Sequence, residues 1–596
     1  MVSRVRSMAT NTIPFLTRNQ IKTNIALGQV LVLHRSFVYK LNSWLSKHPG
    51  GELAILHFVG RDATDEIEAY HPESVIKQMR PFIIGQVAPD ELEDEKTDVG
   101  WKPLNPPIQI GLWPMPALDD SIQSETPDSV AETSTGLAVL NHILVDSNPP
   151  SRTHPSNNLA TINHASSSGS TTLDKRLRAL EPSLDPPEEA AQEGYDLSLA
   201  RQKHLSNSYR VLHDKIRAAG LYSAPRPFYG YGPDLIRYSV LFLAFFLTHP
   251  VSSLLKNYLT SLLFHPTDQL PSVETPSTLR CFCSAVFLGL WWHQITFVAH
   301  DAGHSGISGD WTTDRLIGIL IGNVLNGISI GWWCDVCFSL SLFLYLNHDV
   351  HHLVTNHPEH DPDIQHLPFF AISTKFFKSL RSTYYKHTMR FNGFAKLSIQ
   401  HQHRLYYIIM MFARFNLLFN SCLYLATRKK QRMRNLEIGG IIFFWLYFGT
   451  LLSLLPSNPI RVMFLFVSFA VTSPLHVQIV LSHFAQSTAD LGLNESFAHR
   501  QIRTTMDVSC PAWLDFLHGG LHMQVTHHLF PRLPRHRLRQ ACEQFVRPWC
   551  RQEGLTYNVM GFVDGNSKVL GTLHDVAKQL KILKLVASSQ AHGLKH

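Results

Sequence analysis

Histidines gather in three short boxes whose spacing is that of one helix face. The boxes read HDAGH, HDVHH and QVTHH, and their candidate metal ligands are His300 and His304, then His348, His351 and His352, then Gln524, His527 and His528. Residues at i, i+3 and i+4 of an α-helix are neighbours on its surface, so each box can present its side chains to one point. Imidazole-rich sites suit iron, copper or zinc. These eight groups are more than one ion needs, and they therefore predict a binuclear metal site.

Further polar residues near the boxes are expected to support this site. Asp301 and Asp349 follow the first histidine of their boxes and could orient imidazole N–H groups. The second box opens a stretch, 348–368, that carries six histidines and four acidic residues. We interpret the remaining histidines here, His357, His360 and His366, as outer or structural residues, and His293 as a residue of the bundle interior.

A second pair of histidines lies near the N-terminus with a different spacing. His48 precedes Pro49, Gly50 and Gly51, whose small residues allow a tight turn and the close approach of a flat ligand, and His71 follows 23 residues later. Two neutral imidazoles on opposite walls of an apolar slot can fill both axial positions of a haem iron. A filled coordination sphere favours electron transfer over oxygen binding. The alternative is a surface histidine beside a helix start, and the paired context disfavours it.

Both sets of motifs resemble known families. The stretch VYKLNSWLSKHPGGELAILHFVGRDATDEIEAYHPE resembles the cytochrome b5 domain over residues 20–90, although Ile67 stands where that family often has an aromatic residue. The three boxes resemble those of the membrane fatty-acyl desaturases over residues 225–560. The glutamine that opens the third box and the fused haem domain point to the front-end group. HDAGHSGISGDWTTDRLIG and HGGLHMQVTHHLFPRLPRHRLR look closest to the sphingolipid Δ8-desaturases within it.

This resemblance implies an activity and its cofactors. The chain would be an O2-dependent lipid desaturase that uses haem b and two iron ions and inserts a Δ8 double bond into the long-chain base of a ceramide. Electrons would come from NADH-cytochrome b5 reductase through the fused haem domain. His48 and His71 would be the haem ligands, and the eight box residues together with His483, in VLSHFAQ, would hold iron. No catalytic residue beyond the metal ligands is implied.

Three other functions remain open from the sequence. A front-end desaturase of another acyl chain would use the same boxes. A b5-fused lipid hydroxylase uses similar irons, but the Q-x-x-HH box disfavours it. The third is a haem- or zinc-binding membrane scaffold, which total metal analysis separates from an enzyme, since zinc with no iron would support the scaffold.

Long apolar segments must position the boxes. Residues 236–256, 280–299, 437–456 and 461–482 are each long enough to cross a bilayer core, which needs about 20 residues. The runs 316–333 and 405–425 are less apolar and could span or lie in the interface. With a cytosolic N-terminus, every histidine-rich segment then falls on the cytosolic side. We therefore predict a multi-pass protein of the endoplasmic reticulum membrane, with the haem domain and boxes facing the cytosol.

The segments outside these spans complete a multi-domain prediction for the 596 residues. Residues 1–90 form a small α+β haem domain, 91–195 a disordered linker rich in Ser, Thr, Pro and acidic residues, and 196–596 an all-α polytopic desaturase domain with a cytosolic cap that carries the boxes. The linker is expected to tether the haem domain near the irons. Residues 196–218 are predicted to be helical, with Leu205, Tyr209 and Leu212 on one stripe of a solvated or membrane-surface helix.

Charge, cysteines and one unusual segment constrain the rest. The formal charge of +7 lies largely in short Arg/Lys clusters beside apolar segments, which is typical of cytoplasmic loops and disfavours nucleic-acid binding. The eight cysteines show no disulfide pattern, and Cys334 and Cys337 are interpreted as incidental thiols of a reducing compartment. The N-terminus shows no secretory signal. Residues 337–347 separate the second box from its expected helix as an insertion that the family pattern does not call for.

Overall fold

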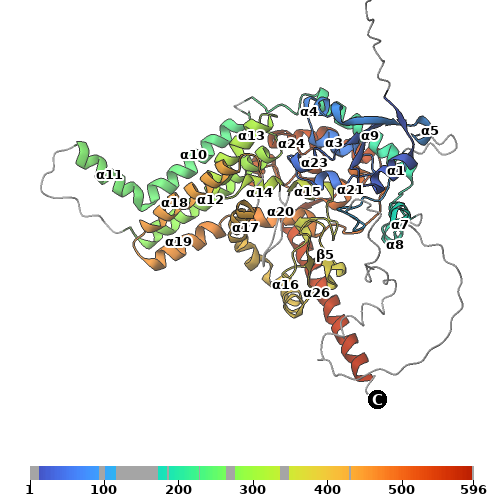
Figure 1. The fold of residues 1–596 in the computed structure, drawn as a ribbon. Helices are drawn as coiled ribbons and strands as arrows, with labels where there is room; N and C mark the ends of the chain where they lie inside the picture. The colour runs from blue at the N-terminus through green and yellow to red at the C-terminus, as the bar shows by residue number, and fades with distance from the viewer. Residues whose placement is uncertain are drawn as a thin grey trace, which may run out of the picture.

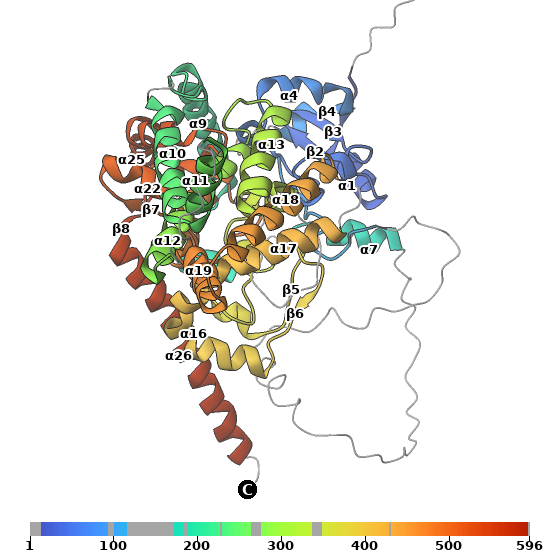
Figure 2. The same ribbon diagram turned by 90° about the vertical axis from the view of Figure 1, so that its left-hand side faces the viewer.

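The computed structural model describes residues 13–92, 101–115, 172–183, 187–226, 229–263, 276–335, 348–427 and 431–593. The long apolar helices lie together at one end of the molecule, and the haem domain and the cap lie at the other (Figure 1). In the view turned by 90°, the apolar helices lie in front and the blue N-terminal domain lies at the upper right (Figure 2). The predicted multi-domain organisation is confirmed. Residues 337–347 lie outside the described residues.

The N-terminal domain is a small α+β unit built on a mixed sheet of order β1-β4-β3-β2. Its strands β2 and β3 pair antiparallel, as do β3 and β4, while β1 pairs parallel with β4. Helix α1 begins at a capping box in which Thr17 and Gln20 each satisfy the other's backbone N–H. Its elements are β1 (Phe15–Leu16), α1 (Arg18–Ala26), β2 (Leu31–His34), β3 (Phe37–Lys40), η1 (Leu45–Lys47), α2 (Leu53–Leu56), α3 (Thr64–Tyr70), α4 (Glu73–Gln78), η2 (Arg80–Phe82), β4 (Ile83–Val87) and α5 (Pro89–Leu92).

Two pieces of the predicted linker are ordered and pack on this domain. Trp101 is buried and donates its indole N–H to the carbonyl oxygen of Gly60 at 3.0 Å. Helix α7 (Thr172–Ala179) follows, and Arg176 donates to the carbonyl oxygen of Ala26 at 3.0 Å. The prediction of disorder throughout 91–195 is therefore wrong for 101–115, for 172–183 and for 187–195, which contains helix α8 (Glu188–Glu193). Apolar side chains of 101–115 and 172–183 are buried against the surface of the N-terminal domain.

The apolar helices provide between three and five candidate spans by length and composition. Straight candidates are α12 (Thr278–Gly303), α18 (Arg434–Ser453) and the pair α19 (Asn458–Ala470) and α20 (Ser473–Phe484), which together run from Asn458 to Phe484. Bent pairs are α10 (Tyr231–Thr248) with α11 (Pro250–Leu263), and α16 (Gly393–Met411) with α17 (Ala413–Thr427). Helix α12 packs between α10 and α19.

One predicted span, and both of the runs that could span or lie in the interface, differ from single straight helices. The expected helix 236–256 is broken by a bend of 76° where Pro250 begins a new helix, because proline cannot continue the hydrogen bonding of the preceding one. The run 405–425 bends by 66° after Met411. Among the described residues, 316–333 forms short pieces and is not a candidate span. These pieces are α13 (Trp311–Gly318), the π-helix η5 (Ile319–Asn326) and α14 (Ile330–Asp335).

The cap surrounds the boxes with short elements. Its elements are α8 (Glu188–Glu193), α9 (Leu199–Ala218), α15 (His348–Leu353), η6 (Pro362–Ile364), η7 (Thr374–Phe377), β5 (Leu380–Arg381), β6 (Thr388–Met389), α21 (Phe497–Thr504), β7 (Asp507–Ser509), η8 (Ala512–Leu514), α22 (Asp515–His518), α23 (Gln524–Leu529), α24 (Arg535–Ala541), η9 (Cys542–Val546), α25 (Arg547–Gln552), β8 (Val559–Gly561) and α26 (Phe562–Gly593).

Helix α9 is neither a solvated nor a membrane-surface helix. Leu205, Tyr209 and Leu212 are all buried, so the predicted apolar stripe of this helix is confirmed. Tyr209 donates its hydroxyl to the carbonyl oxygen of Leu529 at 2.6 Å, and Arg210 forms an ion pair of 2.6 Å with Asp65 of the haem domain. The helix therefore joins the haem domain to the cap.

Candidate metal centres

Two histidines of the N-terminal domain face each other across a slot. The ring centroids of His48 and His71 are 6.0 Å apart, and both side chains are half-buried. His48 Nδ1 lies 2.9 Å from the carbonyl oxygen of Gly51, and His71 Nδ1 lies 3.0 Å from that of Ile67. Since a carbonyl can only accept, each Nδ1 carries the proton and each Nε2 keeps its lone pair.

The same environment keeps both imidazoles neutral. Burial lowers the pKa of His48, and burial together with the neighbouring His48 lowers the pKa of His71 to about 4. A metal ligand must be neutral imidazole, so both side chains are in the ligating form at neutral pH. The pair fits the axial ligands of a haem.

The first and third boxes meet in one triad of histidines. His300 and His304 come from the end of α12, and His527 comes from α23. One ring nitrogen from each lies within 4.8 Å of the others, and all three side chains are buried. Burial holds the pKa of His304 and of His527 well below the usual range, so these two rings are neutral.

A second triad joins the second and third boxes to the end of the last apolar helix. His351 of α15, His483 of α20 and His528 of α23 again bring ring nitrogens within 4.8 Å of one another. The Nε2 atoms of His351 and His483 are 3.2 Å apart. His352 stacks on His528 with ring centroids 3.9 Å apart and lies 4.7 Å from His527, so it stands between the two triads.

Each ring of the second triad has an acceptor at its other nitrogen. His351 Nδ1 lies 2.9 Å from Asp361 Oδ2, and His528 Nδ1 lies 2.9 Å from Gln501 Oε1. His483 Nδ1 lies 3.3 Å from the carbonyl oxygen of Thr504. These contacts fix the tautomer and leave each Nε2 available to a metal, as outer partners do around metal-bound histidines.

Two buried acceptors indicate that the site is built for ions. Within the part of the chain that the structure describes, Gln524 Oε1 and His528 Nε2 are buried without a hydrogen-bond partner. A buried polar atom of this kind is costly unless something satisfies it. Oxygen and imidazole nitrogen donors around two adjacent triads suit a pair of transition-metal ions. The residues therefore fit the predicted binuclear site.

Some predicted residues lie elsewhere. Asp301 accepts hydrogen bonds from Tyr231 at 2.8 Å and Arg535 at 2.9 Å, and its nearest approach to His300 Nδ1 is 3.7 Å. His348 begins α15, but its side chain and that of Asp349 lie outside the described residues. His357 and His360 stack on each other, His366 packs on Phe370 and Phe484, and His293 is buried in α12.

Sequence reasoning missed the residues that orient the second triad. Asp361 lies in the same short stretch as the second box, but nothing in its spacing distinguishes it from its acidic neighbours. Gln501 is far from every box along the chain, and only the fold brings α21 beside α15 and α23.

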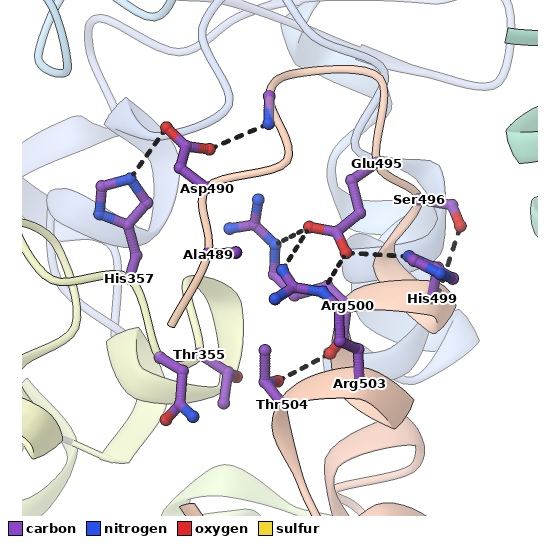
Figure 3. Close-up of polar contacts among 12 residues, drawn as sticks. Thr355, His357, Ala489, Asp490, Glu495, Ser496, His499, Arg500, Arg503 and Thr504 are labelled. Carbon is purple, nitrogen blue, oxygen red and sulfur yellow. Dashed lines mark hydrogen bonds and ion pairs between the residues drawn. The ribbon is translucent and has the colours of Figure 1, made fainter. Parts of the chain in front are cut away.

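A buried ion cluster holds α21 in place (Figure 3). The carboxylate of Glu495 accepts from Arg503 Nε at 2.8 Å, from Arg500 Nε at 3.2 Å and from His499 Nδ1 at 2.9 Å. The guanidinium groups of Arg503 and Arg500, together with the hydrogen bond from His499, hold the pKa of Glu495 well below its usual range despite burial. Because the cluster links the start of α21 to its last turn, it fixes the helix that presents Gln501 and the Thr504 carbonyl to the histidines.

The haem domain touches the histidine-rich cap directly. Tyr70, the residue before His71, has its ring centroid 6.3 Å from that of His352. The ring centroids of His57 in the haem domain and His360 in the cap are 5.1 Å apart. Tyr70 also packs in the hydrophobic cluster that contains α9 and α23 residues. The two candidate centres are thus adjacent through one aromatic side chain.

The chain matches two known protein families, one over its N-terminal domain and one over its helical domain. Residues 17–88 match the cytochrome b5-like heme/steroid binding domain, and residues 276–561 match the fatty acid desaturase family. A Delta 8-(E)-sphingolipid desaturase of Emericella nidulans is 39% identical over 96% of this chain and 95% of its own length. One of Komagataella phaffii is 38% identical over 95% of this chain and 94% of its own length. A Delta(8)-fatty-acid desaturase of Helianthus annuus is 35% identical over 65% of this chain and 77% of its own.

Proposed function

Because the chain belongs to the membrane fatty acid desaturases that carry a fused cytochrome b5 domain, we propose that it is a sphingolipid Δ8-desaturase. Its substrate is the long-chain base of a ceramide, and its product carries a double bond at carbon 8, of E geometry as in the names of its full-length relatives. The observation that carries the proposal is the pair of buried histidine triads beside a haem domain.

The cofactors are haem and a di-iron centre, and this chain's residues divide between them. His48 and His71 are proposed as the haem ligands. His300, His304 and His527 form one iron site, and His351, His483 and His528 form the other. His352 and Gln524 lie where they can complete the set, and His348 keeps its predicted role on the strength of its box alone. When bound, the irons supply the O2-dependent removal of two hydrogens from adjacent methylenes, with electrons delivered singly through the haem.

The protein's own contribution is orientation and exclusion of water. Asp361, Gln501 and the Thr504 carbonyl hold three imidazoles by Nδ1 and aim Nε2 inward. Burial of both triads keeps bulk water from the reacting centre. Docking of Tyr70 against His352 keeps the electron donor at a fixed place.

Membrane placement follows from the helices, and its finer details are proposed. The chain is a membrane protein, and we place it in the endoplasmic reticulum with the haem domain and the triads on the cytosolic side. A haem domain exposed to the cytosol can receive electrons from NADH-cytochrome b5 reductase. We propose 1–90 as the haem domain, 91–195 as the linker and 196–596 as the desaturase domain, with 101–115 and 172–183 of the linker packed on the haem domain and its helix α8 on the cap.

Lipid analysis of a host that lacks sphingolipid Δ8-desaturation tests this function. Expression of the full chain should yield long-chain bases with a double bond at carbon 8, and His528→Ala should yield none. Unsaturated acyl chains with unchanged long-chain bases would favour a desaturase of another acyl substrate. Hydroxylated products would instead favour the b5-fused hydroxylase.

A further inference from the structure

A cavity of about 210 Å³ lies beside the first triad, away from the haem domain's contacts. Its walls come from the start of α10, from α12, from the segment 515–523 and from α24. Both charged and apolar side chains line it, and the metal centres account for none of them. A cavity of mixed character next to a reacting centre is the usual form of a small-molecule subsite.

One wall of the cavity is a buried set of ion pairs. The carboxylate of Asp234 accepts from Arg535, from Arg237 at 2.7 Å and from His536 at 3.0 Å. Arg237 also donates to Gln294 Oε1 at 2.8 Å and stacks over Phe516. This wall therefore presents donors and acceptors held in fixed directions.

A second carboxylate in the cavity lining repeats the arrangement. Asp515 accepts from Arg539 at 2.5 Å and lies 3.1 Å from His522 Nε2. Cys510, Asp515 and His522 have the spacing of a metal site, but Arg539 already neutralises the carboxylate. Because each acid in the cavity is matched by arginine, the chemistry suits a neutral ligand with hydroxyl and amide groups better than a phosphate.

The inner wall leads to the iron ligands. Phe297 lines the cavity one helical turn before His300, and Met523 lines it immediately before Gln524. Gly519, at φ +57°, closes on Phe297 so tightly that an added Cβ would lie 2.0 Å from the ring. A ligand held by the polar walls thus has its deeper end directed at the first triad.

The outer edge carries exposed apolar side chains. Leu235 and Ile236 stand beside the cavity residues of α10, and Trp513 and Leu517 flank Asp515 and Phe516, all of them exposed. Tryptophan and aliphatic side chains at the ends of membrane helices are typical of the membrane–water interface. An amphiphile can therefore reach the cavity from the lipid layer.

We propose that this cavity holds the polar head of the sphingolipid, its amide and hydroxyl groups, and so sets the carbon that is desaturated. The proposal rests on the proposed function and names the part of the chain that measures the substrate. Phe297 of the cavity lining precedes His300 of the triad by three residues, about 4.5 Å along α12, so a head group held in the cavity fixes which part of the chain lies at the triad.

The test compares binding and regiochemistry in cavity variants of the full-length holoenzyme. Binding is measured without reductant, so that no turnover occurs, with ceramide and with a ceramide methylated on both hydroxyls. The variants Arg237→Gln and Asp515→Asn each change one of the two ion-pair sets in the cavity lining. Arg461→Gln is the matched control, because this arginine caps backbone carbonyls near the start of α19 and lines no part of the cavity.

Each cavity variant should bind ceramide about tenfold more weakly, as expected for a lost hydrogen bond to a charged group, and the methylated ceramide should bind as weakly to the wild type. Turnover by the variants should spread the double bond to carbons beside the eighth, while the control keeps one product. Unchanged ceramide binding by both variants, or equal binding of the two lipids by the wild type, would overturn the proposal. If the wild type binds ceramide through the cavity but never desaturates it, the proposed function fails and the subsite stands.

Discussion

The haem site and the di-iron site both orient their imidazoles through a hydrogen bond from Nδ1, but the acceptors lie at different distances along the chain. In the haem domain, the acceptor for each Nδ1 is a carbonyl oxygen three or four residues away, at Gly51 for His48 and Ile67 for His71. In the second triad, the acceptors for His483 and His528 lie 21 and 27 residues away, on α21. The first site is therefore local, whereas the second depends on how the whole cap folds.

This difference predicts that the two sites fail independently when a ligand is lost. His351→Ala and His528→Ala should each abolish desaturation and lower the affinity for non-haem iron by more than 100-fold, since a ligand costs more than an outer partner. The haem absorption spectrum should stay unchanged, because neither residue contacts His48 or His71. Metal analysis and spectroscopy of the same preparation check this. Loss of haem in either variant would show that the domains fold as one unit.

How far the sequence predicts the two sites follows the same division. The proposed ligands His300, His304, His351, His352, His527 and His528 follow from helical spacing, because an i, i+4 pattern has geometric meaning before any tertiary structure exists. His483 stands alone in its segment and followed only from family resemblance. Gln501 could not be predicted, since its role exists only after α21 packs against α15. The bends after Thr248 and Met411 were missed for a related reason, as hydropathy measures length and not direction.

The converse change should break the haem site alone. His48→Ala or His71→Ala removes one of the two imidazoles, so the reduced b-type spectrum should disappear while the non-haem iron remains. Desaturation supported by the fused domain should fall to background. Added soluble cytochrome b5 should restore part of it if the irons are intact. An unchanged spectrum in both variants would exclude these residues as haem ligands.

A smaller effect is expected from an outer partner of the di-iron site. Gln501→Leu keeps the side-chain size but removes the acceptor for His528 Nδ1, so the ring loses its fixed orientation. Iron affinity or turnover should fall by about 10- to 100-fold, the range for such partners.

The matched control for Gln501→Leu is Gln544→Leu, which changes a glutamine of η9 that hydrogen-bonds only Gln540 among the described contacts. Equal iron affinity in both variants would mean that Nδ1 orientation is unimportant here.

The smallest effect should come from shortening the linker where its composition is most polar. Deleting residues 120–165 should change desaturation by less than about twofold, because closure of a flexible tether depends weakly on its length. Deleting 101–115 should act differently, since this segment carries Trp101 and Leu104, which are buried against Gly60 of the haem domain. Loss of that packing should lower the free energy of unfolding of the haem domain by on the order of 3 kcal/mol, measurable by denaturant titration of the haem spectrum.

If the deletion of residues 120–165 abolished turnover in a folded protein, the linker would have a docking role that its composition does not show. The docked haem domain argues for the opposite: once Tyr70 lies against His352 and Arg210 holds Asp65, the tether has only to keep the two partners together between dissociations.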